Sequence, residues 1–185
     1  MLHMEQKDYK LEIVNNLIGR NWHVRGLAKY LGVNHMLLFR KFKELCNKNA
    51  LDYKQEGKNK IYFLKKTTEA KSYVFIAENY KLIKLLEKYP NLRNAIEKIQ
   101  RNKKISLAVI FGSYAKGLAK KDSDIDIYIE TADKKLKRDI ELINSKINVK
   151  IGKYDKNNLL IKEIEKNHVI IKGVEEFYER YNFFD

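Results

Sequence analysis

The chain has 185 residues, enough for one or two small domains, and its 44% hydrophobic and 11% aromatic residues exclude a mainly disordered chain. A single cysteine, Cys46, excludes a disulfide framework and a cysteine-cluster zinc site, and no uncharged apolar run reaches the roughly 18–20 residues of a membrane span, so we expect a cytoplasmic protein without membrane contact. The formal net charge of +14 favours phosphate-bearing partners, although lysine-rich surfaces also occur in proteins that bind no nucleic acid.

The N-terminal third shows helical apolar spacing followed by strand-like alternation. We predict helices over residues 8–18, 24–31 and 35–47, and then strands over 51–55 and 60–64 joined by a turn with a basic tip. Residues 1–66 hold 14 basic and 6 acidic side chains, so the positive charge is densest here. Three helices followed by a hairpin is the order of a winged helix-turn-helix domain.

The stretch LAKYLGVNHMLLFRKFKELCNKNAL resembles that family. The resemblance implies that helix 35–47 lies in the major groove of duplex DNA and that the hairpin, with Lys58 at its tip, touches the backbone or the minor groove. The residues that would face the groove are His35, Met36, Phe39, Arg40 and Lys43. The DNA-binding candidates are therefore His35, Arg40, Lys43 and Lys58, whereas the exposed apolar pair Met36 and Phe39 leaves a protein-interaction role open.

A long helix is predicted over residues 69–89, where Pro90 ends it. Its apolar residues lie on more than one side, which is typical of a helix sandwiched between domains or buried in a dimer, so a homodimer through this helix is open. We divide the chain into a winged helix-turn-helix domain (1–66), linking helices (67–102) and a second domain (103–185).

The second domain begins with a nearly continuous apolar strand over 105–111 that runs into Gly112 and Ser113. Ten residues after Ser113, Asp124 and Asp126 alternate with isoleucines, so both carboxylates point to one side of a strand. Such hard oxygen ligands suit Mg²⁺, while a glycine that lets the backbone approach and a serine hydroxyl suit a phosphate. Together they describe phosphoryl or nucleotidyl transfer.

The run GSYAKGLAKKDSDIDIYIE resembles the signature of the DNA polymerase β nucleotidyltransferase superfamily, in particular its minimal nucleotidyltransferases, and LLIKEIEKNHVIIKGVEEFYE resembles their closing helix–strand–helix. The resemblance implies that Gly112 and Ser113 hold the β- and γ-phosphates of a nucleotide, and that Asp124 and Asp126 are the catalytic Mg²⁺ ligands. Lys116 is a further nucleotide-binding candidate, and Lys120 and Lys121 are weaker ones.

Active members of this superfamily carry a third carboxylate on a following strand. The corresponding strand here is 147–151, and its alternation predicts that Asn148 and Lys150 face the metal side, where neither is a carboxylate. Glu130 lies about 13 Å along the strand from Asp126, too far to share an ion. Asp155, in the next loop, is the remaining candidate.

We therefore expect a mixed α+β fold, with a winged helix-turn-helix joined to a polymerase-β-like domain that has a small mixed sheet. One hypothesis is a Mg²⁺-dependent nucleotidyltransferase that moves NMP, with ATP as the expected donor, to a hydroxyl of protein or RNA. The resemblance also implies an antitoxin-like role with a HEPN-type toxin as protein acceptor. The alternative is a DNA-binding regulator whose degenerate transferase domain binds a nucleotide without turnover.

Overall fold

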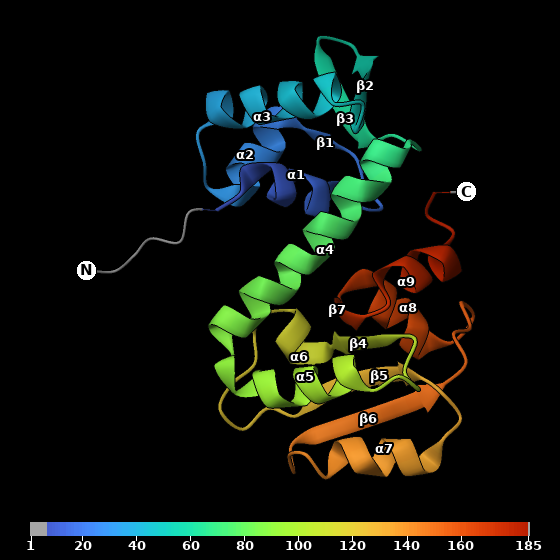
Figure 1. The fold of residues 1–185 in the computed structure, drawn as a ribbon. Helices are drawn as coiled ribbons and strands as arrows, with labels where there is room; N and C mark the ends of the chain where they lie inside the picture. The colour runs from blue at the N-terminus through green and yellow to red at the C-terminus, as the bar shows by residue number, and fades with distance from the viewer. Residues whose placement is uncertain (1–6, 185) are drawn as a thin grey trace. The chain divides into compact units, whose positions relative to one another are not determined.

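The computed structural model describes residues 7–184, which form a mixed α+β structure with two separate sheets (Figure 1). The described chain divides into two compact units, one running to Ala77 and including Phe184, the other spanning Glu78–Phe183. The division falls inside a single long helix, α4 (Thr68–Lys88). Within residues 7–184, no helix has both the length and the apolar character that crossing a membrane requires.

The first unit has the predicted order of three helices and a hairpin. Its elements are α1 (Tyr9–Leu17), β1 (Trp22–His23), α2 (Val24–Leu31), α3 (His35–Asn47), β2 (Leu51–Glu56) and β3 (Asn59–Leu64). The short strand β1 was not predicted; it pairs antiparallel with β3 and makes a three-stranded sheet in the order β1-β3-β2. Two residues are too few for alternation to mark a strand, so only the pairing with β3 reveals it.

Local caps and a small apolar core hold this unit together. The Asn34 side chain accepts a hydrogen bond from the Met36 backbone N–H at 2.8 Å and so caps the N-terminus of α3. Leu38, Phe42 and Leu45 of α3 are fully buried, and Phe42 packs on Tyr62 of β3 with ring centroids 4.6 Å apart. The buried stripe turns the opposite side of α3 to solvent.

The second unit is built on one four-stranded sheet in the order β6-β5-β4-β7. β5 and β6 run parallel, and β4 is antiparallel to both of its neighbours. Besides the C-terminal part of α4, the elements are the 3₁₀ turn Pro90–Leu92, α5 (Arg93–Arg101), β4 (Ala108–Phe111), α6 (Gly112–Ala115), β5 (Ile125–Glu130), α7 (Lys134–Glu141), β6 (Ile147–Gly152), α8 (Leu159–Lys166), β7 (Val169–Lys172) and α9 (Val174–Tyr181).

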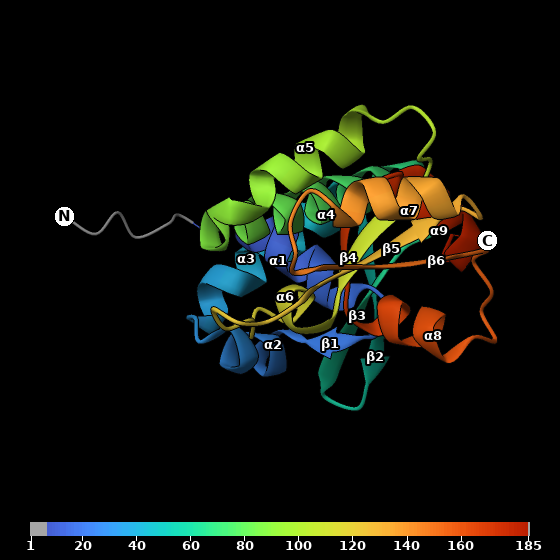
Figure 2. The ribbon, with the colours of Figure 1, turned by 90° about the horizontal axis from the view of Figure 1, so that it is seen from below.

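The two faces of this sheet are covered by different helices. Side chains of α4, α5 and α7 pack with Ile125, Ile127 and Ile129 of β5 in one apolar cluster, which includes Leu82 and Ile96. Of the residues 67–102 that were expected to link two domains, those from Leu82 to Ile99 thus contribute side chains to the core of the second unit. α8 contacts β4 and lies on the other side of the sheet from α5 and α7 (Figure 2). Because side chains alternate along a strand, Asp126 faces the α8 side.

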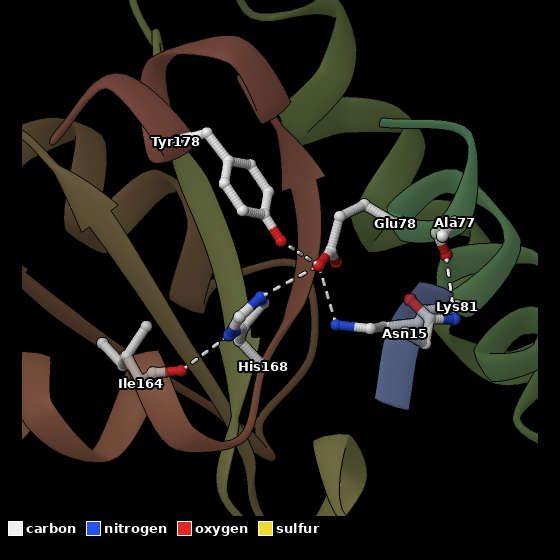
Figure 3. A network of polar contacts seen from close by, with 7 residues as sticks. All are labelled: Asn15, Ala77, Glu78, Lys81, Ile164, His168 and Tyr178. Atoms are coloured by element: carbon white, nitrogen blue, oxygen red, sulfur yellow. Dashed lines mark hydrogen bonds and ion pairs between the residues drawn. The ribbon is translucent and has the colours of Figure 1, made fainter. Parts of the chain in front are cut away.

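A buried carboxylate joins α4 to the end of the chain. Glu78 is 0% exposed, and its Oε1 accepts hydrogen bonds from Tyr178 Oη at 2.7 Å and Lys81 Nζ at 2.8 Å, with His168 Nε2 at 3.3 Å (Figure 3). Burial raises the pKa of Glu78, but the charges of Lys81 and His168 outweigh burial and lower it to about 2. The carboxylate is therefore ionised and ties α4 to α9 and to the residue before β7.

Candidate functional site

The turn from β4 into α6 places Gly112 directly against Asp126. Phe111, the last residue of β4, is the cross-strand partner of Asp126, and the backbone then turns at Gly112 with a φ of +69°. A Cβ atom at position 112 would lie 2.5 Å from Asp126 Oδ2. Only glycine fits here, because it has no side chain and adopts positive φ without strain.

The loop after Gly112 folds back on itself and is anchored at two points. The Leu118 N–H donates to the Ser113 carbonyl oxygen at 2.9 Å, and Lys88 Nζ, from the end of α4, donates to the Gly117 carbonyl oxygen at 2.7 Å. Ser113 itself is half-buried in the first turn of α6. Lys116 is exposed, with its Nζ 3.3 Å from Glu163 Oε1 on α8. Lys120 and Lys121 point to solvent.

Asp124 and Asp126 lie at the start of β5, as the sequence predicted. Asp124 is exposed and Asp126 is half-buried, while the intervening Ile125 is buried in the core. In the parallel pairing of β5 with β6, Asp126 stands opposite Asn148, whose Nδ2 donates to Asp126 Oδ1 at 3.1 Å. The predicted orientation of Asn148 toward the aspartates is therefore confirmed.

The charges around Asp126 are crowded. Burial raises the pKa of Asp126, and the carboxylates of Asp124 and Glu163 raise it further, against the lowering effects of the Asn148 hydrogen bond and Lys150. The net pKa is above its ordinary value, because the site disfavours another unneutralised negative charge. A divalent cation relieves such crowding, so the hard oxygen atoms of Asp124 and Asp126 fit Mg²⁺.

None of the expected substitutes for a third carboxylate lies beside Asp126. Asp155 follows the far end of β6, where its Oδ1 accepts from the Asn157 N–H and closes a turn. Glu130, at the far end of β5, forms an ion pair with Arg180 at 2.7 Å. Across residues 7–184, no three His, Cys, Asp or Glu side chains are grouped so that they could hold one metal ion. Among the described residues, the predicted site thus offers the two carboxylates of Asp124 and Asp126.

Sequence reasoning missed Glu163. Its position within an amphipathic helix, α8, carries no local signal of a role, and 47 residues separate it from Lys116. Only the packing of α8 on the sheet brings its carboxylate to the Gly-Ser loop.

In the first unit, the DNA-binding candidates are exposed together. His35, Arg40 and Lys43 are solvent-exposed on α3, and Lys58 is exposed in the turn between β2 and β3. The apolar pair on the same helix is also open to solvent, with Met36 49% and Phe39 42% exposed. The structure therefore leaves this face of α3 both basic and apolar.

A pocket of about 380 Å³ opens beside α3 in this unit. Phe39 and Lys58, which the sequence singled out, line it together with residues that it did not: His23, Val24, Arg25, Asn59, Lys60 and Tyr62. Arg25 on α2 and Lys60 on β3 were missed because only tertiary packing brings these elements together beside α3. Cationic side chains around an aromatic ring suit a phosphate linked to a flat group.

Comparison with solved structures gives partial likenesses. One is reduced HlyU from Vibrio cholerae N16961, with 19% identity over 40% of this chain and 77% of that one and a TM-score of 0.35. Another is the adhesin competence repressor AdcR from Streptococcus pyogenes, with 16% identity over 50% of this chain and 69% of that one and a TM-score of 0.40. A third is a toxin-antitoxin crystallised with AMP-PNP, with 23% identity over 58% of this chain and 80% of that one and a TM-score of 0.34. No curated protein matches the chain.

A family model is more specific. Residues 93–176 match the model described as polymerase beta, nucleotidyltransferase. The matched part contains Gly112 and Ser113 as well as Asp124 and Asp126 on the strand beside them. This part of the chain is therefore similar to nucleotidyltransferase domains of the polymerase beta type.

Proposed function

We propose that the protein is a Mg²⁺-dependent nucleotidyltransferase that moves NMP, with ATP as the preferred donor, to a hydroxyl of a protein or RNA acceptor. The observation that carries the proposal is the contact between Gly112 and Asp126. It joins a turn suited to phosphate with a carboxylate whose pKa is raised, chiefly by burial, in the part of the chain that matches the nucleotidyltransferase family model.

Each residue has a distinct role in this proposal. Asp124 and Asp126 would hold the metal ion, which supplies charge neutralisation at the phosphates. The backbone at Gly112 and the hydroxyl of Ser113 bind the β- and γ-phosphates, and Lys116 offsets their negative charge. In the transfer, the acceptor oxygen bonds to the α-phosphorus, the bond to pyrophosphate breaks and the hydroxyl proton is released.

Asn148 favours a second candidate function. An amide cannot take the proton of the acceptor hydroxyl, and it neutralises less metal charge than a carboxylate. The domain would then bind NTP without turnover. Nucleotide binding would change how tightly the first unit binds duplex DNA through α3 and the pocket beside it. Arg40 and Lys43, exposed on α3, would contact phosphates or bases.

Two protein partners fit these proposals. A HEPN-type toxin would be the acceptor if the protein acts as an antitoxin. A second copy of the chain would pair through α4, where Ile76 and Ile83 are 52% and 53% exposed and seven residues apart. Seven residues is two helical turns, so both side chains lie on one stripe.

Incubation with α-labelled ATP or GTP and Mg²⁺ tests the first candidate. The parent should transfer label to an acceptor, supplied as tRNA or as the protein encoded beside it, and Asp126→Asn should abolish transfer. Asp122→Asn is the matched control, because it removes the same charge from an exposed aspartate four residues away. Mg²⁺-dependent NTP binding without any transfer selects the regulator instead, and absence of NTP binding contradicts both candidates.

A further inference from the structure

One ion pair of the second unit crosses from the phosphate-binding turn to a distant helix. Lys116, which directly follows α6, has its Nζ 3.3 Å from Oε1 of Glu163 on α8. The Lys116 and Glu163 side chains are 39% and 49% exposed, so neither is locked in the core and each remains open to an incoming ligand. Exposed ion pairs of this kind are weak and exchange partners readily.

Glu163 lies on the side of the sheet where the aspartates are. α8 covers the face that Asp126 points to, opposite the cluster of α4, α5 and α7. The Glu163 carboxylate also raises the pKa of Asp126, which places its charge within electrostatic reach of that group. Glu163 is nevertheless not grouped with Asp124 and Asp126 as a three-carboxylate metal site within the described residues.

A carboxylate that pairs with a lysine at a phosphate-binding turn competes with the phosphate. Both are anions that accept hydrogen bonds from an ammonium group, and Lys116 Nζ lies beside the turn, where it pairs with Glu163. A bound polyphosphate carries several negative charges, so it attracts the ammonium group more strongly than one carboxylate does.

We propose that Glu163 is a positioning residue that holds Lys116 until a nucleoside triphosphate binds. Lys116 then exchanges the carboxylate for a phosphate oxygen. Glu163 thereby lowers the affinity of the empty site for anions and selects for ligands with enough charge to displace it. This inference rests on the proposed binding of NTP by the second unit.

The test is a double-mutant cycle on the full chain, with calorimetric binding of the non-cleavable analogue α,β-methylene-ATP and Mg²⁺. Glu163→Gln should lower the dissociation constant by about two- to five-fold, the range expected for releasing an exposed ion pair. The gain should disappear in the Lys116→Met background and should shrink at 0.5 M salt. Glu179→Gln, an exposed change of the same charge on α9, should leave binding unaltered.

The outcomes separate this inference from the proposed function. If Glu163→Gln raises the affinity for the analogue equally with and without Lys116, the effect is a long-range charge effect. That result overturns the proposed exchange of partners by Lys116. Weaker Mg²⁺-dependent binding in Glu163→Gln makes Glu163 a metal ligand and also overturns it, while leaving the proposed function intact. If neither the parent nor Glu163→Gln binds the analogue, the proposed function fails and the inference fails with it.

Discussion

Gly112 and Asp126 are so close that a single methyl group at position 112 would lie 2.5 Å from a carboxylate oxygen. Gly112 directly follows β4 and Asp126 lies near the start of β5, and the pairing of these strands brings the two residues together. A side chain at position 112 would force the Asp126 carboxylate to move, and the positive φ there also favours glycine. This closeness brings the turn at Gly112 and the Asp126 carboxylate together.

Gly112→Ala should damage both stability and binding. The methyl group clashes with Asp126, and alanine at a φ of +69° costs about 1–2 kcal/mol on its own. We expect a loss of about 1–3 kcal/mol in unfolding free energy and loss of Mg²⁺-dependent NTP binding, measured by denaturant titration and calorimetry. Gly152→Ala is the control, because a Cβ there meets no atom within 4 Å. Unchanged NTP affinity in Gly112→Ala would place the nucleotide elsewhere.

Asn148→Asp should make the site more dependent on metal. Without Mg²⁺ the new carboxylate opposes Asp126 across the β5–β6 pairing and lowers the melting temperature. With Mg²⁺ it becomes a third anionic ligand, so the metal-induced rise in melting temperature should exceed that of the parent. Lys150→Asp should show a smaller effect, because Lys150 stands opposite Tyr128 rather than Asp126. Equal metal-induced shifts in Asn148→Asp and the parent would contradict a metal site at Asp126.

Glu78 should make folding sensitive to acid. Its folded-state pKa of about 2 lies below the ordinary value of 4.5, so its ionised form contributes stability that is present above about pH 4.5 and is lost as the pH falls toward 2. The parent should therefore lose about 1–3 kcal/mol more unfolding free energy than Glu78→Gln between pH 6 and pH 2.5. At pH 7, Glu78→Gln should itself be less stable by about 3 kcal/mol, because Lys81 and His168 lose their anionic partner.

The control for this prediction is Glu97→Gln. Glu97 pairs with Arg101 on the surface of α5, with its side chain 56% exposed, so its removal should change stability by less than about 1 kcal/mol and leave the acid profile as in the parent. Denaturant titrations at several pH values, followed by tyrosine fluorescence, measure all three proteins. If Glu78→Gln and the parent lost the same unfolding free energy between pH 6 and pH 2.5, other carboxylates would govern the acid response.

The pocket beside α3 should contribute phosphate contacts. If duplex DNA binds there, the double change Arg25→Ala and Lys58→Ala should weaken binding and flatten the plot of log affinity against log salt by about 0.9 per lost contact. The matched change Lys103→Ala and Lys104→Ala removes two exposed lysines from the second unit and should leave the slope unaltered. Fluorescence anisotropy over a salt series measures the slope. An unchanged slope in the pocket variant would assign this face, with Met36 and Phe39, to a protein partner.

The local pattern of the sequence was sufficient to predict most helices and strands and the strand faces on which Asp126 and Asn148 lie. The alternation Asp-Ile-Asp-Ile placed Asp126 and the isoleucines on opposite faces of β5, and the odd apolar positions of β6 turned Asn148 toward the aspartates. Alternation of apolar and polar residues predicts strand orientation well because each strand buries one face. A register shift of one residue would expose all of its apolar side chains.

Tertiary structure alone decided which distant groups meet. Lys116 and Glu163 are 47 residues apart, Glu78 and His168 are 90 apart, and Arg25 of α2 lines one pocket with Phe39 of α3. No periodicity encodes these pairs, because they depend on how helices pack on sheets rather than on the conformation of either segment. The sequence by itself thus determined the strands and the strand faces on which the candidate residues lie, whereas packing determined which charges surround those residues and how strongly the charges act.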